Sequence, residues 1–143
     1  MKIKRSGSVV WQGGIKDGKG ELSTESGALS SYPYGFASRF EGQKGSNPEE
    51  LIAAAHAGCF TMALSKILGE AGFTAEKMET SAVCTLEKVD DGFAITGIDL
   101  ALTGKVPSCS KEQFEELAGK AKAGCPVSKV LNTNITLSVT LED

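Results

Sequence analysis

The chain has 143 residues, of which 41% are hydrophobic and 23% are charged. This size and composition are ordinary for a globular protein with one core, and they exclude disordered, collagen-like and coiled-coil classes. A net charge of -3 supplies no basic field to hold a phosphate backbone, so we expect no nucleic acid partner. From its length we predict that the chain forms a single domain over residues 1–143.

The first 42 residues are predicted to be strands joined by turns. Strands are expected at residues 3–12, 20–24 and 35–41, separated by a break at Gly13 and Gly14 and by a loop rich in Ser, Tyr and Pro. The N-terminus lacks the apolar run and small-residue cleavage site of a signal peptide. We therefore expect the protein in the cytoplasm.

A long apolar helix is predicted next. Asn47 as the N-cap, Pro48 at the first helical position and Glu49 in the first turn mark its start, and Gly72 marks its end. We expect it to be too short and too polar at its ends to span a membrane. Apolar residues occupy nearly all of its sides, so most of its surface must be buried. Because a short chain encloses such a helix poorly, the helix favours a homodimer with two copies at its centre.

The rest of the chain is predicted to contain a hairpin, two helices and a last strand. The hairpin lies within residues 78–103, around Asp90-Asp91-Gly92, and the last strand covers residues 134–141. Ser110 opens a helix over residues 111–122 with a capping box. Gly124 ends that helix and Pro126 begins a short one, which places Cys125 near a helix N-terminus.

The chain has four cysteines. In a reducing compartment we expect each to be an inert core residue, a metal ligand or a redox-active thiol. Only the thiolate is a good nucleophile, and an unperturbed thiol is mostly protonated at neutral pH. The helix N-terminus can stabilise an anion at Cys125. Cys59 lies about three turns inside its helix, where the backbone donors are already used, so its activation requires a side-chain cation.

Arg39 is one candidate for that cation. A guanidinium buried within residues 35–41 would need an acidic partner, such as Glu41 or a glutamate at the helix start, and could then serve a neighbouring anion. The alternating pattern of this segment by itself favours an Arg39 that points to water.

Five segments together resemble the OsmC/Ohr family, over nearly the whole chain. The most specific combination is an Asn-Pro-Glu helix start, a cysteine ten residues later and a distant Cys-Pro. The position of Arg39 in the sequence resembles that of the site arginine in the OsmC branch, because the Ohr branch carries its site arginine nearer the N-terminus. The segments are Tyr34-Gly35-Phe36, Arg39-Phe40-Glu41-Gly42, Gly45-Ser46-Asn47-Pro48-Glu49-Glu50-Leu51, Ala55-His56-Ala57-Gly58-Cys59-Phe60 and Ala123-Gly124-Cys125-Pro126-Val127-Ser128.

The resemblance implies a stress-response peroxidase that reduces organic hydroperoxides, and hydrogen peroxide less well. It implies that Cys59 is the reactive cysteine and Cys125 the resolving one, with Arg39 and Glu49 completing the site. It also implies an α+β fold, with antiparallel sheets around central helices, in an intertwined homodimer whose sites lie at the interface. We expect no metal and no organic cofactor, and an external dithiol as the reductant.

Helix geometry bears on how such a site is assembled. Ten residues of helix separate Glu49 from Cys59 by about 15 Å along the axis, so the two side chains cannot touch within one helix. If Glu49 orients Arg39 and Arg39 lies over Cys59, a site built from two chains is the simpler arrangement.

Two other functions remain open from the sequence. His56, Cys59, Cys84 and Cys125 are residue types that suit zinc, although no Cys-x-x-Cys pair is present. The second alternative is a non-catalytic stress protein or small-ligand binder.

Several further side chains have an expected environment. A packed, hydrogen-bonded state is favoured for His56 over a role as base or ligand. Cys84 is expected in the core, and Cys109 is expected to be an exposed loop thiol. Three apolar side chains are candidates to line the approach of a hydroperoxide: Phe36, Phe60 and Met62.

Overall fold

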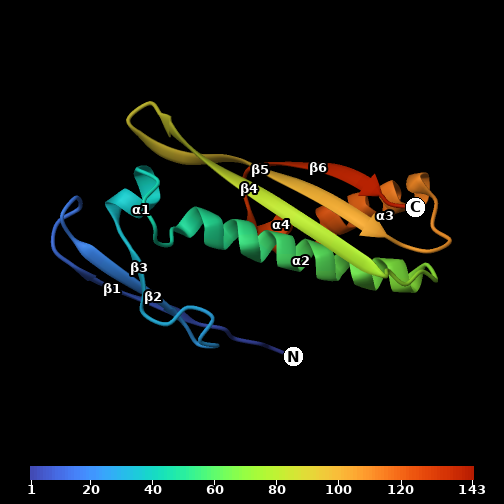
Figure 1. Ribbon diagram of the computed structural model, residues 1–143, viewed down its shortest axis with the longest axis horizontal. Coiled ribbons are helices and arrows are strands. Elements are labelled where there is room, and N and C mark those ends of the chain that lie inside the picture. The colour runs from blue at the N-terminus through green and yellow to red at the C-terminus, as the bar shows by residue number, and fades with distance from the viewer. The chain divides into compact units, whose positions relative to one another are not determined.

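A computed structural model describes residues 1–143, and their contacts divide the chain into two compact units, Met1–Leu51 and Ile52–Asp143 (Figure 1). Two three-stranded sheets and four helices confirm the α+β class. The single domain over residues 1–143 stays a prediction.

The first unit contains an antiparallel sheet of the order β1-β2-β3, formed by Gly7–Gln12, Lys19–Thr24 and Tyr32–Tyr34. Gly20 of β2 pairs with Trp11 on one side and with Tyr34 on the other. The two rings pack with centroids 5.6 Å apart. A Cβ atom at Gly20 would meet both rings at less than van der Waals distance, so the aromatic pair requires glycine here.

The strand predicted for residues 35–41 is wrong, because Phe36–Phe40 form the short helix α1 and the strand β3 precedes it. Ser38 Oγ accepts the N–H of Gly35 at 2.9 Å and donates to the carbonyl of Ser46 at 2.9 Å. These bonds stabilise a helical turn. Phe36 and Phe40 then lie four residues apart on one helix face, with ring centroids 5.0 Å apart.

Helix α2 covers Pro48–Glu70 and confirms the predicted start and end signals. Asn47 Oδ1 accepts the N–H of Glu50 at 2.8 Å, and Gly72 follows the helix with a φ of 88°, a conformation that favours glycine. With 23 residues and a mean hydropathy of 1.5 over its apolar window, α2 is long and apolar enough to cross a membrane. This corrects the expectation that it is too short, although core helices of soluble proteins meet the same criterion.

The second unit contains a sheet of the order β4-β5-β6, formed by Lys77–Val89, Gly92–Lys105 and Asn134–Leu141. The predicted hairpin is confirmed, with Asp90 and Asp91 as its two-residue loop and Asp90 at a φ of 46°. Helices α3 (Lys111–Gly124) and α4 (Pro126–Val130) connect β5 to β6. Because this connection crosses over, β6 pairs with β5 in parallel. Within this sheet only β4 and β5 meet the expected antiparallel arrangement.

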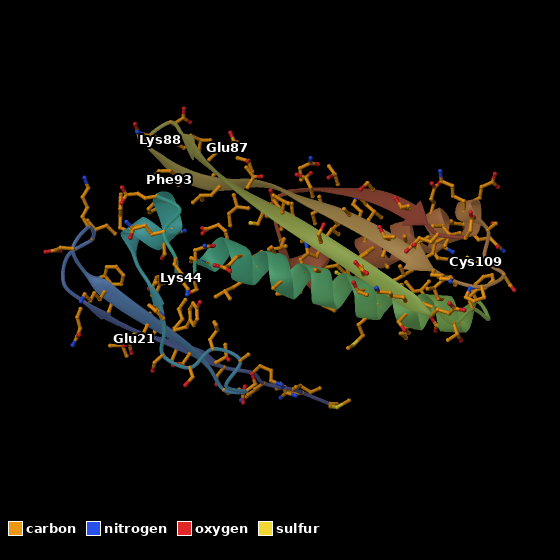
Figure 2. All side chains as sticks on the ribbon, in the orientation of Figure 1. Glu21, Lys44, Glu87, Lys88, Phe93 and Cys109 are labelled. Atoms are coloured by element: carbon orange, nitrogen blue, oxygen red, sulfur yellow. The ribbon has the colours of Figure 1, made fainter.

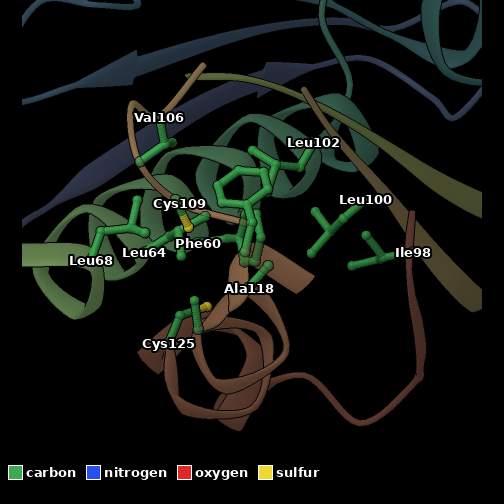
Figure 3. Close-up of a cluster of buried hydrophobic side chains, with 12 residues drawn as sticks. Phe60, Leu64, Leu68, Ile98, Leu100, Leu102, Val106, Cys109, Ala118 and Cys125 are labelled. Atoms are coloured by element: carbon green, nitrogen blue, oxygen red, sulfur yellow. The ribbon is translucent and has the colours of Figure 1, made fainter. Parts of the chain in front are cut away.

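The core of the second unit lies between the sheet and the helices (Figure 3). Strand β5 turns every second residue inward, as a half-buried strand must. Helices α2 and α3 contribute apolar residues at helical spacing. The largest contributors are Phe60, Leu64, Leu68, Ile98, Leu100, Leu102 and Phe114, all at most 1% exposed.

The expectation of an exposed Cys109 is wrong. Figure 2 shows Cys109 in the segment between β5 and α3, and its residue is only 9% exposed. It belongs to the same buried cluster as Val106 and Phe114. Burial raises the pKa of its thiol, so Cys109 is an unreactive core thiol. Cys84 is partly buried against this cluster, which agrees with the core role expected for it.

Candidate functional site

Arg39 and Glu49 form an ion pair within the first unit. Arg39 lies on α1 and Glu49 in the first turn of α2. The Arg39 Nη2 and Nε atoms lie 2.7 and 3.1 Å from Glu49 Oε1. The Glu49 side chain is only 9% exposed and that of Arg39 37% exposed. The strand expected at Arg39 is therefore wrong, because the residue lies on helix α1, whereas its side chain is exposed to water as expected and also pairs with the buried Glu49 carboxylate.

An aromatic recess surrounds this arginine. The Arg39 guanidinium carbon lies 5.3 Å from the centroid of the Phe40 ring, a distance at which a cation is attracted to the ring. The recess has a volume of about 210 Å³ and is lined by Trp11, Ile15, Tyr34, Gly35, Phe36, Arg39 and Phe40. Phe36 belongs to this recess. A held cation beside apolar walls suits a small anionic or polarised group with an organic substituent.

Cys59 and Cys125 are brought together in the second unit, and both thiols are free. Cys125 is fully buried and Cys59 half-buried. Burial raises the pKa of the Cys59 thiol, the backbone N–H of Val127 lowers it, and the neighbouring Cys125 sulfur raises it. The effect of Val127 on the pKa of Cys59 was not predicted from the sequence. The backbone N–H of Val127 comes from a helix start far along the chain, and such a donor leaves no local pattern.

Ser128 joins Cys125 to His56. Ser128 Oγ lies 3.1 Å from Cys125 Sγ and 2.7 Å from His56 Nε2, and the Ser128 N–H also donates to Cys125 Sγ at 3.3 Å. Cys125 is the N-cap of α4, as predicted. His56 is fully buried, and burial lowers the pKa of its ring. The packed, hydrogen-bonded His56 is confirmed, whereas Ser128 is a residue that the sequence reasoning missed.

An apolar groove of about 500 Å³ opens beside the Cys59 thiol. Met62 is 77% exposed there, whereas Phe60 is fully buried in the core. Of the three apolar residues expected to line an approach, only Met62 therefore lies beside Cys59. The groove is lined by Cys59, Met62, Ala63, Lys66, Ile67, Gly124 and Pro126.

The four predicted site residues thus fall into two pairs, one in each unit. Arg39 with Glu49 forms the first pair, and Cys59 with Cys125 forms the second. The metal alternative named His56, Cys59, Cys84 and Cys125, and the structure has no group of three His, Cys, Asp or Glu side chains that could hold a metal ion.

Comparisons with known proteins identify the family of this chain. Residues 41–140 match the family described as OsmC-like protein. Peroxiredoxin OsmC of Escherichia coli is 56% identical over 142 residues, which cover 99% of each chain. Organic hydroperoxide resistance protein OhrB of Bacillus subtilis is 28% identical over 123 residues, which cover 86% of this chain and 89% of OhrB.

Solved structures show the same fold. The crystal structure of OhrB of Bacillus subtilis has a TM-score of 0.68 over 96% of this chain and 98% of that one. The OsmC-like protein from Mycoplasma pneumoniae is only 16% identical but has a TM-score of 0.76 over the full length of both chains. The sequence match and the fold together show that this chain belongs to the OsmC/Ohr family, in its OsmC branch.

Proposed function

We propose that this protein is a thiol-dependent peroxidase that reduces organic hydroperoxides, and hydrogen peroxide less well, to alcohols under oxidative or osmotic stress. One observation carries the proposal. Two free thiols, Cys59 and Cys125, are neighbours in a chain that is 56% identical over its length to a protein named Peroxiredoxin OsmC. A pair of neighbouring cysteines is what a two-cysteine thiol peroxidase needs, because one thiol is oxidised by the peroxide and the other condenses with the resulting sulfenic acid.

The first step is nucleophilic attack by the Cys59 thiolate. Its sulfur attacks the distal peroxide oxygen, the O–O bond breaks, and Cys59 becomes a sulfenic acid while the alkoxide takes a proton and leaves as the alcohol. The Arg39 guanidinium, held by Glu49, stabilises the thiolate and polarises the peroxide. The apolar groove beside Cys59 accepts the organic part of the substrate.

The second step regenerates the enzyme without a metal or organic cofactor. The Cys125 sulfur attacks the sulfenic acid sulfur, which releases water and forms a Cys59–Cys125 disulfide. An external dithiol then reduces the disulfide by exchange, and its own sulfurs become a disulfide. This cycle belongs to a reducing compartment, which for this protein we take to be the cytoplasm.

A homodimer with two α2 helices at its centre is part of this proposal. Only 28% of the apolar window of α2 is buried within the chain. The exposed residues share one helix face, at spacings of three and four, and most are small enough for another helix to pack closely. Within residues 51–69 they are Ala54, Ala55, Gly58, Met62, Ser65, Lys66 and Gly69.

We predict that size-exclusion chromatography with light scattering gives twice the mass of the 14.9 kDa chain. The reason is that burying the α2 face removes apolar surface from water, at about 25 cal/mol per Å². A mass of one chain at micromolar concentration would contradict the dimer, and with it the proposal that Arg39 and Glu49 of one protomer serve Cys59 of its partner across the interface.

The experiment that tests the function is a titration of the reduced protein with one equivalent of cumene hydroperoxide, followed by disulfide mapping with mass spectrometry. We expect one equivalent of alcohol and a Cys59–Cys125 disulfide, with Cys84 and Cys109 still reduced. Unmodified thiols, with the hydroperoxide intact, would instead support a binding protein that does not turn over.

A further inference from the structure

His56 is fully buried, and one of its two ring nitrogens has no hydrogen-bond partner. The residue is 0% exposed, yet its Nδ1 atom has no hydrogen-bond partner. The other ring nitrogen, Nε2, contacts Ser128 Oγ at 2.7 Å. Most buried polar atoms in proteins are satisfied, so an unsatisfied one in a native structure needs an explanation. The ring has a single polar contact, and that contact leads to a cysteine.

The contact continues from Ser128 to the sulfur of Cys125. Ser128 Oγ lies 3.1 Å from Cys125 Sγ, within hydrogen-bonding distance for sulfur. The Ser128 N–H also donates to the same sulfur at 3.3 Å, which holds the serine in place beside it. The side chains Cys125, Ser128 and His56 therefore form an unbroken chain of hydrogen bonds inside the second unit.

The chemistry of the three groups allows this chain to run in either direction. A hydroxyl both donates and accepts, and a neutral imidazole has one nitrogen with a proton and one without. In one direction the thiol donates to Ser128 Oγ and the Ser128 hydroxyl donates to a bare His56 Nε2. In the other, Nε2–H donates to Ser128 and Ser128 donates to a thiolate. Reversing the direction moves a proton from Cys125 to His56 with little motion of heavy atoms.

We infer that Ser128 and His56 form a proton relay that takes the proton from the Cys125 thiol as its sulfur attacks the sulfenic acid at Cys59. The inference rests on the proposed peroxidase function and adds residues to its second step. Ser128 touches the reacting sulfur, whereas His56 acts through Ser128 and is a positioning residue. Burial lowers the pKa of His56, which favours the neutral ring before and after the resolving step.

The resolving step then balances without another reactant. The S–S bond forms between Cys125 and Cys59 while the S–O bond of the sulfenic acid breaks. The thiol proton passes to Ser128 Oγ as the Ser128 proton passes to His56 Nε2. The departing hydroxide takes a proton back from the relay and leaves as water, so that His56 ends neutral. The relay has no part in the attack of Cys59 on the peroxide.

The test separates the two steps by rapid quenching of the full-length protein after mixing with cumene hydroperoxide. Mass spectrometry measures the Cys59 sulfenic acid, trapped with dimedone, and the Cys59–Cys125 disulfide over time. Ser128→Ala removes the relay hydroxyl and Ser128→Thr keeps it. His56→Gln can still donate to Ser128 but cannot accept a proton.

We expect Ser128→Ala and His56→Gln to slow disulfide formation at least about tenfold, since general acid–base catalysis contributes roughly 10²- to 10⁴-fold. Formation of the sulfenic acid should stay within about twofold of the unmodified protein, so more of it is trapped. Ser128→Thr should restore disulfide formation to within about threefold. The matched control is Thr61→Val, at a position on the same helix as His56. This variant removes a hydroxyl that bonds the Ala57 carbonyl and the Thr80 hydroxyl, and it should change neither step.

Disulfide formation at the normal rate in Ser128→Ala or in His56→Gln would overturn the relay and leave the peroxidase function standing. Equal slowing of both steps would also overturn it, because that pattern reports a displaced helix rather than a lost proton path. A failure of the unmodified protein to form any sulfenic acid would instead contradict the proposed function itself.

Discussion

Replacing Cys59 with Ser should abolish hydroperoxide reduction, with a loss of at least about a thousandfold in the rate of peroxide consumption. A hydroxyl in that place is a far weaker nucleophile than a thiolate and cannot become a sulfenic acid. The measurement is the consumption of cumene hydroperoxide with a dithiol in excess. Unchanged consumption in Cys59→Ser would remove the proposed mechanism.

Two further variants sharpen this result. Cys125→Ser should consume one equivalent of hydroperoxide per chain to form the Cys59 sulfenic acid, and a second equivalent as excess hydroperoxide oxidises that unresolved sulfenic acid to the inactive sulfinic acid, and then stop. Cys84→Ala should keep full turnover, since Cys84 only packs against the core. If Cys125→Ser turned over with the same dithiol at the normal rate, Cys125 would not be the resolving cysteine.

Elements with local signals were predicted well from the sequence. The Asn47 cap and Gly72 bound α2, Ser110 caps α3 through the Gln113 N–H at 3.1 Å, and Asp90 begins the hairpin loop. Each signal is a hydrogen bond or backbone angle set by residues close together in the chain, so it can be found without tertiary information.

The wrong predictions have tertiary causes. The segment around Ser38 alternates like a strand, but its hydroxyl bonds Ser46, eight residues away, and the turn becomes helix α1. Cys109 has polar neighbours in the sequence, but in the structure it belongs to the same buried apolar cluster as Phe114. Tertiary contacts of this kind override local pattern.

The candidate site shows the same division. The resemblance to a family predicts both cysteines, Arg39 and Glu49 as site residues, and the structure places them in two close pairs. The hydrogen bonds that surround Cys125 needed the structure. Ser128 lies at the third position of α4, where its N–H is free to reach the N-cap sulfur. Its hydroxyl reaches His56, 72 residues earlier in the chain, and no pattern in the sequence predicts that contact.

Loss of Arg39 should move the pH dependence of the first step to higher pH. Burial raises the pKa of the Cys59 thiol, so less thiolate is present at neutral pH. A guanidinium nearby lowers a thiol pKa, and its removal in Arg39→Gln should raise the midpoint of the rate profile by about one to three pH units. The rate should therefore fall about ten- to a thousandfold at pH 7 and recover in part at alkaline pH.

The control for this variant is the other arginine. Arg5 is exposed and bonds only the neighbouring Lys4 carbonyl, so Arg5→Gln should leave the rate profile unchanged. The measurement is the rate of Cys59 oxidation by cumene hydroperoxide between pH 5 and 9, with the sulfenic acid trapped. An identical midpoint in Arg39→Gln and in the unmodified protein would show that Arg39 does not stabilise the thiolate.

A mixture of two impaired variants, assayed at pH 7, then decides which protomer supplies the arginine. Arg39→Gln and Cys59→Ser are unfolded together and refolded, so that about half of the dimers contain one chain of each. If Arg39 serves the partner protomer, each mixed dimer has one intact site, with Cys59 from the first chain and Arg39 from the second. About a quarter of the unmodified activity should then return. If Arg39 serves its own chain, every mixed site lacks one group and the activity does not rise above the residual activity of Arg39→Gln, which would place the complete site within a single protomer.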